Sequence, residues 1–427
     1  MEMENSLMSV AVLVLVLCLS AAACHAQGAE TEPLRVGMAR VEITPQELAY
    51  MAGFAGRKER STGAYKDITA SCLVFDNGVM RLGLMAVDVL FIDRYYKTDL
   101  GPVQLTAIRK AAEAVGIAPE RMMINASHTH CGPKFEDNGD YPEVFIEKVC
   151  GLLEAAVADL QPARLDYTVG TCSMAINRRR TNEEGKCTGM RPTPLKPIDM
   201  EVPVMRVVSP EGQARAIIFG YACHPSTMGG LEIGPDYPGF ARDWVEAAYG
   251  EGCMATFLQG CGGDIKPRNV SGTSRFRSGP LEAVEELGHE LGRAVVTATC
   301  VPLEPMAAAA DGGVPLAATS QIVPLPSKKD PSKPYPIEMQ VLRIGDVYIV
   351  GMNGEICVEI GLHIKRELAD LKLFVIGYCN QRVSYIPAAS SYPEGGYEVN
   401  CTRVAPTGED MIVAKAVEMT RSLATLK

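Results

Sequence analysis

The sequence predicts an α/β protein in which layered mixed β-sheets are flanked by helices. Short apolar stretches of strand length alternate along the chain with longer amphipathic stretches of helix length. Three pairs of strand-like stretches are joined by tight-turn sequences, so some neighbouring strands are expected to run antiparallel. With 47% hydrophobic and 22% charged residues, the 427-residue chain has the composition of a folded globular protein.

The expected elements follow in order along the chain. Hairpins are predicted at 72–87, with Asn77-Gly78 as the tight turn, and at 204–219 and 340–350. Helices are predicted at 102–116, 142–160, 239–249, 280–299, 355–370 and 409–425. Residues 305–337 are rich in Ala, Gly, Pro and Lys and are expected to form a long surface connection, and the basic segment 178–197 is expected to be a loop.

The first 26 residues have the features of a signal peptide. An apolar run at 9–20 is followed by small residues up to Ala26, and the run is too short to span a membrane comfortably. Export is therefore expected, with a single catalytic domain at 33–427. The stretch before the apolar run lacks Lys and Arg, and Cys24 follows three alanines, so a retained helix or lipid anchor is the alternative.

The charge of the chain limits its partners. A net charge of -10 and a pI of about 5.3 disfavour a nucleic-acid partner, because phosphate binding needs a basic face. An anionic membrane surface is disfavoured for the same reason, and no obligatory protein partner is evident. Two of the fourteen cysteines lie in the leader, and among the other twelve we expect a mixture of disulfides and buried free thiols.

Two short polar motifs carry three of the six histidines. One is 125–133, with His128 and His130, and the other is 220–228, with His224; each directly follows a strand-like stretch, where α/β proteins place ligand-binding groups. On an extended backbone, side chains at i and i+2 point to the same side, so His128 and His130 are expected to approach one metal or substrate. A pair of hydrogen-bonded loop histidines is the alternative. His289 and His363 lie in expected helices without polar company and are predicted to be structural.

Glu355 ends another strand-like stretch. A lone Glu there often only complements a helix dipole. Two His and one Glu, however, form a zinc-ligand set that leaves room for a reactive water molecule. The chain has no HExxH and no GxSxG motif, which disfavours those zinc-protease and serine-hydrolase classes.

Taken together, these motifs resemble those of the neutral, non-lysosomal ceramidases, amidases that split ceramide into sphingosine and a fatty acid. The resemblance runs from the stretch 36–45 to about Glu398. Residues 127–133 and 223–228 are similar to the family's two histidine motifs, and 176–178 to its arginine motif. The stretches 236–241, 258–267, 353–355, 380–385 and 397–398 follow in the family's order.

The resemblance implies a role for each matching residue. It implies four zinc ligands: His128, His224, Glu355 and Tyr385. It also implies that His130 transfers protons beside the metal and that Arg178 and Tyr397 hold the substrate oxygen as it becomes an oxyanion. For Asp264 it suggests a supporting role, such as orienting an imidazole, with a simple turn-forming Gly-Gly-Asp as the alternative.

The chain departs from the family around the substrate rather than around the metal. Pro133-Lys-Phe stands where the family usually has a glycine pair, and the helix after Glu355 lacks the family's paired arginines. The family's immunoglobulin-like C-terminal domain is expected to be absent. Three hypotheses stay open: a Zn2+-dependent amidase acting on a ceramide-like or related N-acyl lipid, a zinc hydrolase of the same fold acting on a non-lipid amide or ester, and a secreted non-catalytic binding protein with a structural metal. A lipid amidase needs an apolar channel, whereas polar walls favour a sugar or peptide derivative.

Overall fold

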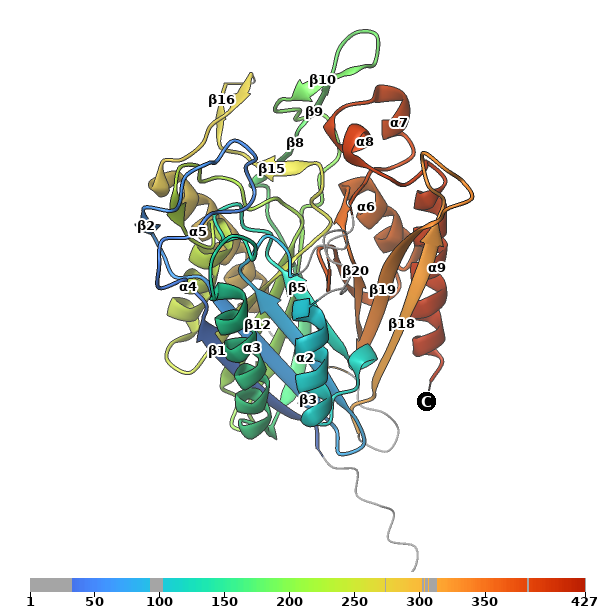
Figure 1. Ribbon diagram of the computed structural model, residues 1–427. Helices are drawn as coiled ribbons and strands as arrows, with labels where there is room; N and C mark the ends of the chain where they lie inside the picture. The colour runs from blue at the N-terminus through green and yellow to red at the C-terminus, as the bar shows by residue number, and fades with distance from the viewer. Residues whose placement is uncertain are drawn as a thin grey trace, which may run out of the picture. The chain divides into compact units, whose positions relative to one another are not determined.

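The computed structural model describes residues 33–92, 103–272, 274–301, 303, 306, 313–381 and 384–426 (Figure 1). The predicted signal peptide lies outside the described residues, so its cleavage and the export of the chain stay predictions. Within the described part of the chain, no helix is both long enough and apolar enough to cross a bilayer.

The first sheet is formed mainly by the N-terminal third of the chain. Its order is β5-β4-β3-β1-β6, with β1(Arg35–Glu42), β3(Thr69–Asp76), β4(Arg81–Val87), β5(Met122–Ala126) and β6(Gln161–Pro162). The predicted hairpin is β3–β4, and β5 joins β4 in parallel. Helices α2(Val103–Ala114) and α3(Tyr141–Ala158) lie beside this sheet (Figure 1). A Cβ atom at Gly37 of β1 would lie 1.9 Å from the Ala156 carbonyl oxygen, so the close approach of α3 depends on glycine there.

A second sheet has the order β14-β12-β11-β7, with β7(Arg164–Thr171), β11(Glu201–Val208), β12(Ala214–Tyr221) and β14(Met254–Gln259). Helices α4(Tyr237–Tyr249) and α5(Leu281–Thr299) pack against each other and against this sheet. The third sheet has the order β18-β19-β20-β22, with β18(Leu316–Leu325), β19(Tyr335–Ile344), β20(Val347–Met352) and β22(Lys372–Ile376). It is covered by α9(Gly408–Ala424) and α6(Val358–Glu367).

One apolar cluster joins the three sheets. It includes Val36 of β1, Ile218 of β12 and Ile349 of β20, all fully buried. The remaining elements are short and lie in loops: β2(Gly63–Ala64), η2(Pro119–Arg121), β8(Ala175–Asn177), β9(Arg179–Thr181), β10(Cys187–Met190), β13(Glu232–Ile233), β15(Ile265–Pro267), β16(Val270–Ser271), β17(Arg275–Phe276), β21(Glu355–Ile356), β23(Tyr385–Ile386), α7(Ser391–Glu394) and α8(Tyr397–Cys401). The layered α/β architecture predicted from the sequence is thus confirmed.

Three local predictions were wrong. The stretch 305–337 contains β18, a ten-residue edge strand whose partial exposure gave it a weak apolar pattern and whose Pro324 is tolerated at a sheet edge. The segment 178–197 contains the short paired strands β9 and β10 rather than only a loop. The helix expected from 355 begins at Val358, because Glu355 and Ile356 pair with β23.

The twelve cysteines outside the leader, all of them in the described part of the chain, are free thiols, and most of them are buried. The expectation that some pair as disulfides was therefore wrong for these residues. Cys72, on β3, illustrates the cause: it is fully buried and packs as a small apolar side chain in the first sheet's core. Burial raises the pKa of its thiol to about 12, which keeps it protonated.

Two buried asparagines fasten the sheets together beneath the site. The Asn125 side chain, on β5, donates to the Gly377 carbonyl at 2.7 Å and accepts from the Gln259 N–H at 2.7 Å. The Asn380 side chain accepts from the Ile124 N–H at 3.1 Å and donates to Gln340 at 3.0 Å. The ends of β5, β14 and β22 are therefore held together by satisfied buried hydrogen bonds.

Candidate metal centre

The first candidate residue stands just beyond the end of β5. His128 has a φ of 65°, in the left-handed region that non-glycine residues rarely adopt. Its backbone N–H donates to the Val89 carbonyl at 3.0 Å, which holds this turn against the continuation of β4. His128 and His130 are therefore not side by side on an extended strand, as the sequence pattern suggested. The turn still brings their Nε2 atoms to 3.4 Å from each other.

The other candidates arrive from the second and third sheets. His224 follows β12 and is fully buried. Glu355 begins β21, and Tyr385 begins β23; the two strands are parallel, with Glu355 directly opposite Tyr385. The backbone of β21 lies so close to the turn at 262–264 that a Cβ atom at Gly263 would be 2.7 Å from the Glu355 carbonyl oxygen.

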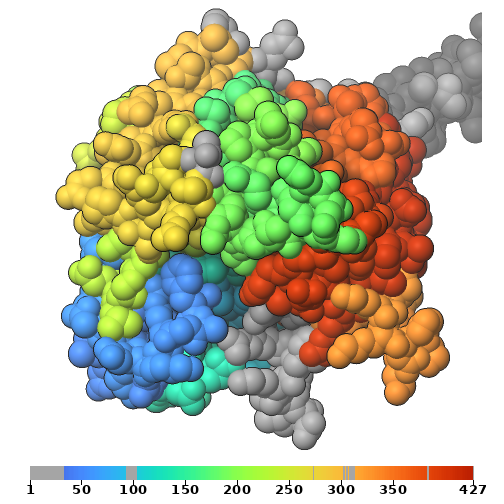
Figure 2. All heavy atoms as spheres, turned by 90° about the horizontal axis from the view of Figure 1, so that it is seen from above, coloured from blue at the N-terminus to red at the C-terminus, as the bar shows by residue number. Residues whose placement is uncertain are grey.

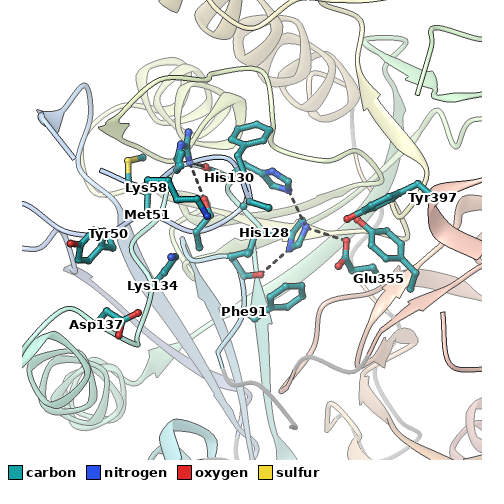
Figure 3. Close-up of a pocket in the computed structure, with 17 residues that line it drawn as sticks. Tyr50, Met51, Lys58, Phe91, His128, His130, Lys134, Asp137, Glu355 and Tyr397 are labelled. Atoms are coloured by element: carbon teal, nitrogen blue, oxygen red, sulfur yellow. Dashed lines mark hydrogen bonds and ion pairs between the residues drawn. The ribbon is translucent and has the colours of Figure 1, made fainter. Parts of the chain in front are cut away.

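The spacing of the three closest side chains fits a tetrahedral metal site. The Glu355 Oε2 atom lies 3.4 Å from His128 Nε2 and 3.4 Å from His224 Nε2. Zinc bonds to N and O are about 2.0–2.2 Å long, and a tetrahedron with such a centre has edges of about 3.3–3.6 Å. Figure 3 shows His128 between His130 and Glu355 on one side of a pocket.

The hydrogen bonds on the far side of each imidazole decide its protonation. His128 Nδ1 lies 2.9 Å from the Leu90 carbonyl oxygen, and His224 Nδ1 lies 2.6 Å from that of Gly262. A carbonyl only accepts, so each Nδ1 carries the proton and each Nε2 presents a lone pair toward Glu355. Burial lowers the pKa of His224 to about 4, with the Arg178 charge acting in the same direction, so this ring is neutral at neutral pH.

Two imidazole nitrogens therefore face a carboxylate in a buried site. His224 Nε2 makes no hydrogen bond although it is fully buried. Such an arrangement is costly unless a cation lies among the three atoms. Burial alone raises the pKa of Glu355, but the neighbouring His128 and His224 outweigh it and the net pKa is well below the usual range. These residues fit a divalent metal.

His130 differs from its two neighbours. The Nε2 or Nδ1 atoms of His128, His130 and His224 all lie within 4.8 Å of one another, so distance alone admits a three-histidine site. Yet His130 Nδ1 is buried without a hydrogen bond, whereas metal-binding imidazoles almost always donate their second N–H to an acceptor. Burial lowers the pKa of His130 well below its usual value, and the two other imidazoles lower it further. The ring is therefore neutral, and no acceptor holds a proton at its Nδ1.

The remaining predicted residues surround Tyr385. Arg178 is 3% exposed; its NH2 lies 3.4 Å from the Tyr385 hydroxyl and its Nε 2.8 Å from Glu398. Burial raises the pKa of Tyr385 well above 10, and Glu355 adds to the rise while Arg178 opposes it. The Tyr397 ring lies 5.3 Å from that of Tyr385, edge to face, and is 46% exposed.

Asp264 is buried but does not orient an imidazole. Its carboxylate accepts from the Val358 N–H at 2.8 Å and from the Asn177 amide at 3.2 Å. The suggested imidazole contact was therefore wrong, since the Gly262 carbonyl holds His224 instead. His363 was expected to have no polar neighbour, but a Glu409 carboxylate oxygen lies 3.3 Å from its Nδ1.

A cavity of about 610 Å³ opens in front of the cluster. One wall is the loop from Tyr50 to Lys58, and the opposite wall carries Tyr385 and Tyr397. Figure 2 shows a hollow between the blue N-terminal segment and the orange-red C-terminal segment. Apolar lining comes from Met51, Phe54, Leu90 and Phe91; polar lining beyond the cluster includes Lys58, Lys134 and Asp137.

Sequence reasoning missed Tyr378. Its ring lies 4.4 Å from that of His128, its φ is 56°, and its buried hydroxyl has no hydrogen-bond partner. Burial raises its pKa well above 10, and the nearby charges of Glu355 and Tyr385 add to the rise. The only signal in the sequence was its place at the end of a strand, in the stretch 373–380 beside the predicted tyrosine motif.

Two curated proteins are similar to this chain over most of its length. A search of protein-family models gives no match. The chain is 24% identical to the neutral ceramidase of Pseudomonas aeruginosa, over 88% of this chain and 70% of that protein. It is 22% identical to the neutral ceramidase of Mycobacterium tuberculosis, over 86% of this chain and 74% of that protein. These similarities support the resemblance to the neutral ceramidase family that the motifs indicated.

The solved ceramidase structures show the same fold. The crystal structure of the P. aeruginosa neutral ceramidase superposes with a TM-score of 0.75 at 19% identity, over 92% of this chain and 74% of that one. A ceramidase complexed with C2 gives a TM-score of 0.75 at 18% identity, over 92% and 75%. The predicted α/β fold is thereby confirmed over most of the chain.

Proposed function

We propose that this chain is a zinc-dependent hydrolase that cleaves the amide bond of an N-acyl substrate, with a ceramide-like lipid as the substrate class its relatives suggest. The observation that carries the proposal is the 3.4 Å spacing from Glu355 Oε2 to the lone-pair nitrogens of His128 and His224. This set supplies three ligands and leaves one side open to the cavity, as in catalytic zinc sites. The curated relatives are named neutral ceramidases, which supports an amide as the bond that is cleaved.

His128, His224 and Glu355 would hold the ion, with the Tyr385 hydroxyl beside Glu355 as the fourth group proposed from the family motif. A bound zinc ion supplies Lewis-acid chemistry, polarising a carbonyl and lowering the pKa of a water molecule to about 7. The Leu90 and Gly262 carbonyls fix the two imidazoles in the tautomer that binding needs.

His130 is suited to move protons. Its imidazole lines the cavity, and its lowered pKa keeps it neutral and able to accept a proton from water. The same ring can then donate that proton to the leaving amine, which is a poor leaving group when unprotonated. The missing partner at Nδ1 leaves the ring free to change which nitrogen carries the proton.

Tyr397 and Tyr385 form the opposite wall, where a substrate oxygen gains charge. Tyr397 is half-exposed and lines the cavity, so its hydroxyl can donate to that oxygen. Arg178 does not line the cavity; it bears on the reaction through the Tyr385 hydroxyl, 3.4 Å from its NH2. We therefore propose Arg178 as a positioning residue rather than a direct oxyanion donor.

The cavity walls bear on the substrate. Met51, Phe54, Leu90 and Phe91 offer an apolar strip that suits an acyl chain. The polar part of the lining favours the second candidate, a hydrolase of the same fold that acts on a smaller polar amide or ester. The cavity in front of the cluster argues against a purely structural metal, whose site keeps no position open to a water molecule or substrate.

The test measures metal content and turnover on the same purified variants. His224→Ala should lose the metal, because the change removes one of its direct ligands. His130→Ala and Tyr397→Phe should keep zinc and fold but lose turnover, by about 10²–10³ for the lost oxyanion donor. His289→Ala, in helix α5 beside Trp244, is the control and should change neither quantity. Wild-type turnover in His130→Ala and Tyr397→Phe at full zinc occupancy would refute the assigned roles.

A further inference from the structure

The loop side of the cavity carries positive charge that no described acidic side chain pairs with. Lys58 and Lys134 line the cavity, and neither makes a hydrogen bond through its ammonium group or an ion pair with any described residue. The Lys134 ammonium lies 5.9 Å from the centre of the Tyr50 ring. Figure 3 shows Lys134 and Tyr50 on the side of the pocket away from Glu355 and Tyr397.

Arg57 adds a third positive charge to this wall. Its guanidinium donates to the Gly230 carbonyl at 2.7 Å, the Ala52 carbonyl at 2.9 Å and the His130 carbonyl. These acceptors are neutral, so they orient the guanidinium without cancelling its charge. Asp137 is the acidic side chain that lines this side, and it forms no ion pair with either lysine within 4.0 Å.

Hydrogen bonds join the two backbone segments that form this wall. The Lys134 N–H donates to the Tyr50 carbonyl at 2.8 Å. The buried Asn138 amide donates to that same carbonyl at 2.9 Å and to the Lys134 carbonyl at 2.8 Å, and it accepts from the Tyr50 N–H at 2.7 Å. The two segments that carry the charges are therefore fixed relative to each other.

We propose that this wall is an anion subsite, so that the preferred substrate is an N-acyl amide whose non-acyl part bears a carboxylate or a phosphate. The proposal rests on the amidase activity proposed above. Cations gathered in a cleft attract anionic ligands, and this wall is a local positive site on a chain whose net charge is -10. The acyl chain would lie along the apolar strip, and the anionic group would contact Lys58 and Lys134.

The experiment uses short, monomeric substrates, so that attraction to a lipid surface plays no part. N-hexanoyl glycine carries a carboxylate, hexanoyl ceramide 1-phosphate a phosphate, and hexanoyl ceramide and N-hexanoyl ethanolamine are the matched neutral compounds. For the wild-type zinc-loaded protein, kcat/KM should be at least about 10-fold higher for one anionic compound than for its neutral partner, a factor that corresponds to one charge-assisted contact. The carboxylate and phosphate arms show which anion the wall accepts.

Variants assign the effect to the wall. Lys58→Gln and Lys134→Gln should each lower kcat/KM for the anionic compound about 10-fold and leave the neutral compound unchanged. Asp137→Asn should raise it, because it removes the opposing charge, and Asn tolerates the φ of 66° at that position. Lys110→Gln, an exposed lysine on α2, is the control and should have no effect.

A binding measurement keeps this proposal separate from the catalytic one. Calorimetric titration of N-hexanoyl glycine into wild type and Lys134→Gln reports the subsite even if no amide is cleaved. Weaker binding in the variant without turnover of any compound would leave the subsite standing and overturn the amidase proposal. Equal kcat/KM for anionic and neutral compounds, or a loss in Lys58→Gln and Lys134→Gln no larger than that in Lys110→Gln, would overturn the subsite.

Discussion

Glu398 holds two buried arginines behind the site, and removing its charge should destabilise the protein strongly. The Glu398 Oε1 atom lies 2.8 Å from Arg178 Nε and its Oε2 atom 2.5 Å from Arg179 NH1. The three side chains are 1%, 3% and 2% exposed. Glu398→Gln keeps the shape but leaves two guanidiniums without their shared carboxylate, and breaking a buried pair this way typically costs about 3–5 kcal/mol.

The pH dependence gives this prediction a second readout. Burial raises the pKa of Glu398, but the two arginines outweigh it, and its folded pKa lies below the usual value. A depressed folded pKa means that the stabilisation is complete above the unfolded pKa, about 4.3, and is lost as pH falls through the folded pKa. The difference in unfolding free energy between wild type and Glu398→Gln should therefore be constant near pH 7 and shrink below about pH 4.

The assay is urea denaturation at several pH values, with turnover measured alongside. Glu394→Gln is the matched control, because Glu394 lies 3.1 Å from the same Arg179 but is 24% exposed; it should cost less than about 1 kcal/mol. In Glu398→Gln, Arg178 also loses the contact that aims it at Tyr385, so turnover should fall in the folded fraction. A cost equal to that of Glu394→Gln, independent of pH, would refute the reasoning.

Two further predictions concern the backbone around the site. Gly263→Ala should lower the metal affinity while the fold is retained, because the added Cβ atom would lie 2.7 Å from the Glu355 carbonyl oxygen and displace β21. Zinc titration measures the affinity, and circular dichroism checks the fold. Asn125→Ala should destabilise the protein by about 2–4 kcal/mol, because it leaves the buried Gly377 carbonyl and Gln259 N–H unpaired; urea denaturation checks it, and an effect under about 1 kcal/mol would contradict the fastening role.

The sequence predicted the fold class because the local signals agree with the final structure. The three hairpins were marked by tight-turn sequences, and the helices by one-sided apolar patterns, so their existence was correct and their bounds nearly so. Strand β18 was not predicted, because this edge strand is partly exposed and mixes Thr, Ser, Gln and Pro with its apolar residues. The cysteines were misjudged because spacing does not show whether a thiol is near another thiol or buried among aliphatic side chains.

The residues of the site could be chosen from the sequence, but their arrangement could not. His128, His224 and Glu355 each follow a different strand. In α/β proteins, ligands bind at the carboxyl ends of strands, so these positions already indicated a site. Their 3.4 Å spacing depends on contacts between sheets, such as the Asn125 hydrogen bonds, which have no local pattern. Asp264 illustrates the limit: a polar residue in a recognisable motif was assigned an imidazole that a backbone carbonyl holds instead.

The groups that set the chemistry of this site are largely backbone groups. The Leu90 and Gly262 carbonyls decide which nitrogen of His128 and His224 faces Glu355. Any residue type offers such a carbonyl, so the backbone conformation there matters more than the identity of the side chain. The left-handed φ of 65° at His128 is one consequence, because a strained backbone persists only where the surrounding structure holds it. Since Val89 accepts the His128 N–H while the next residue, Leu90, holds its ring, one short stretch after β4 fixes both the strained backbone and the tautomer of the same histidine.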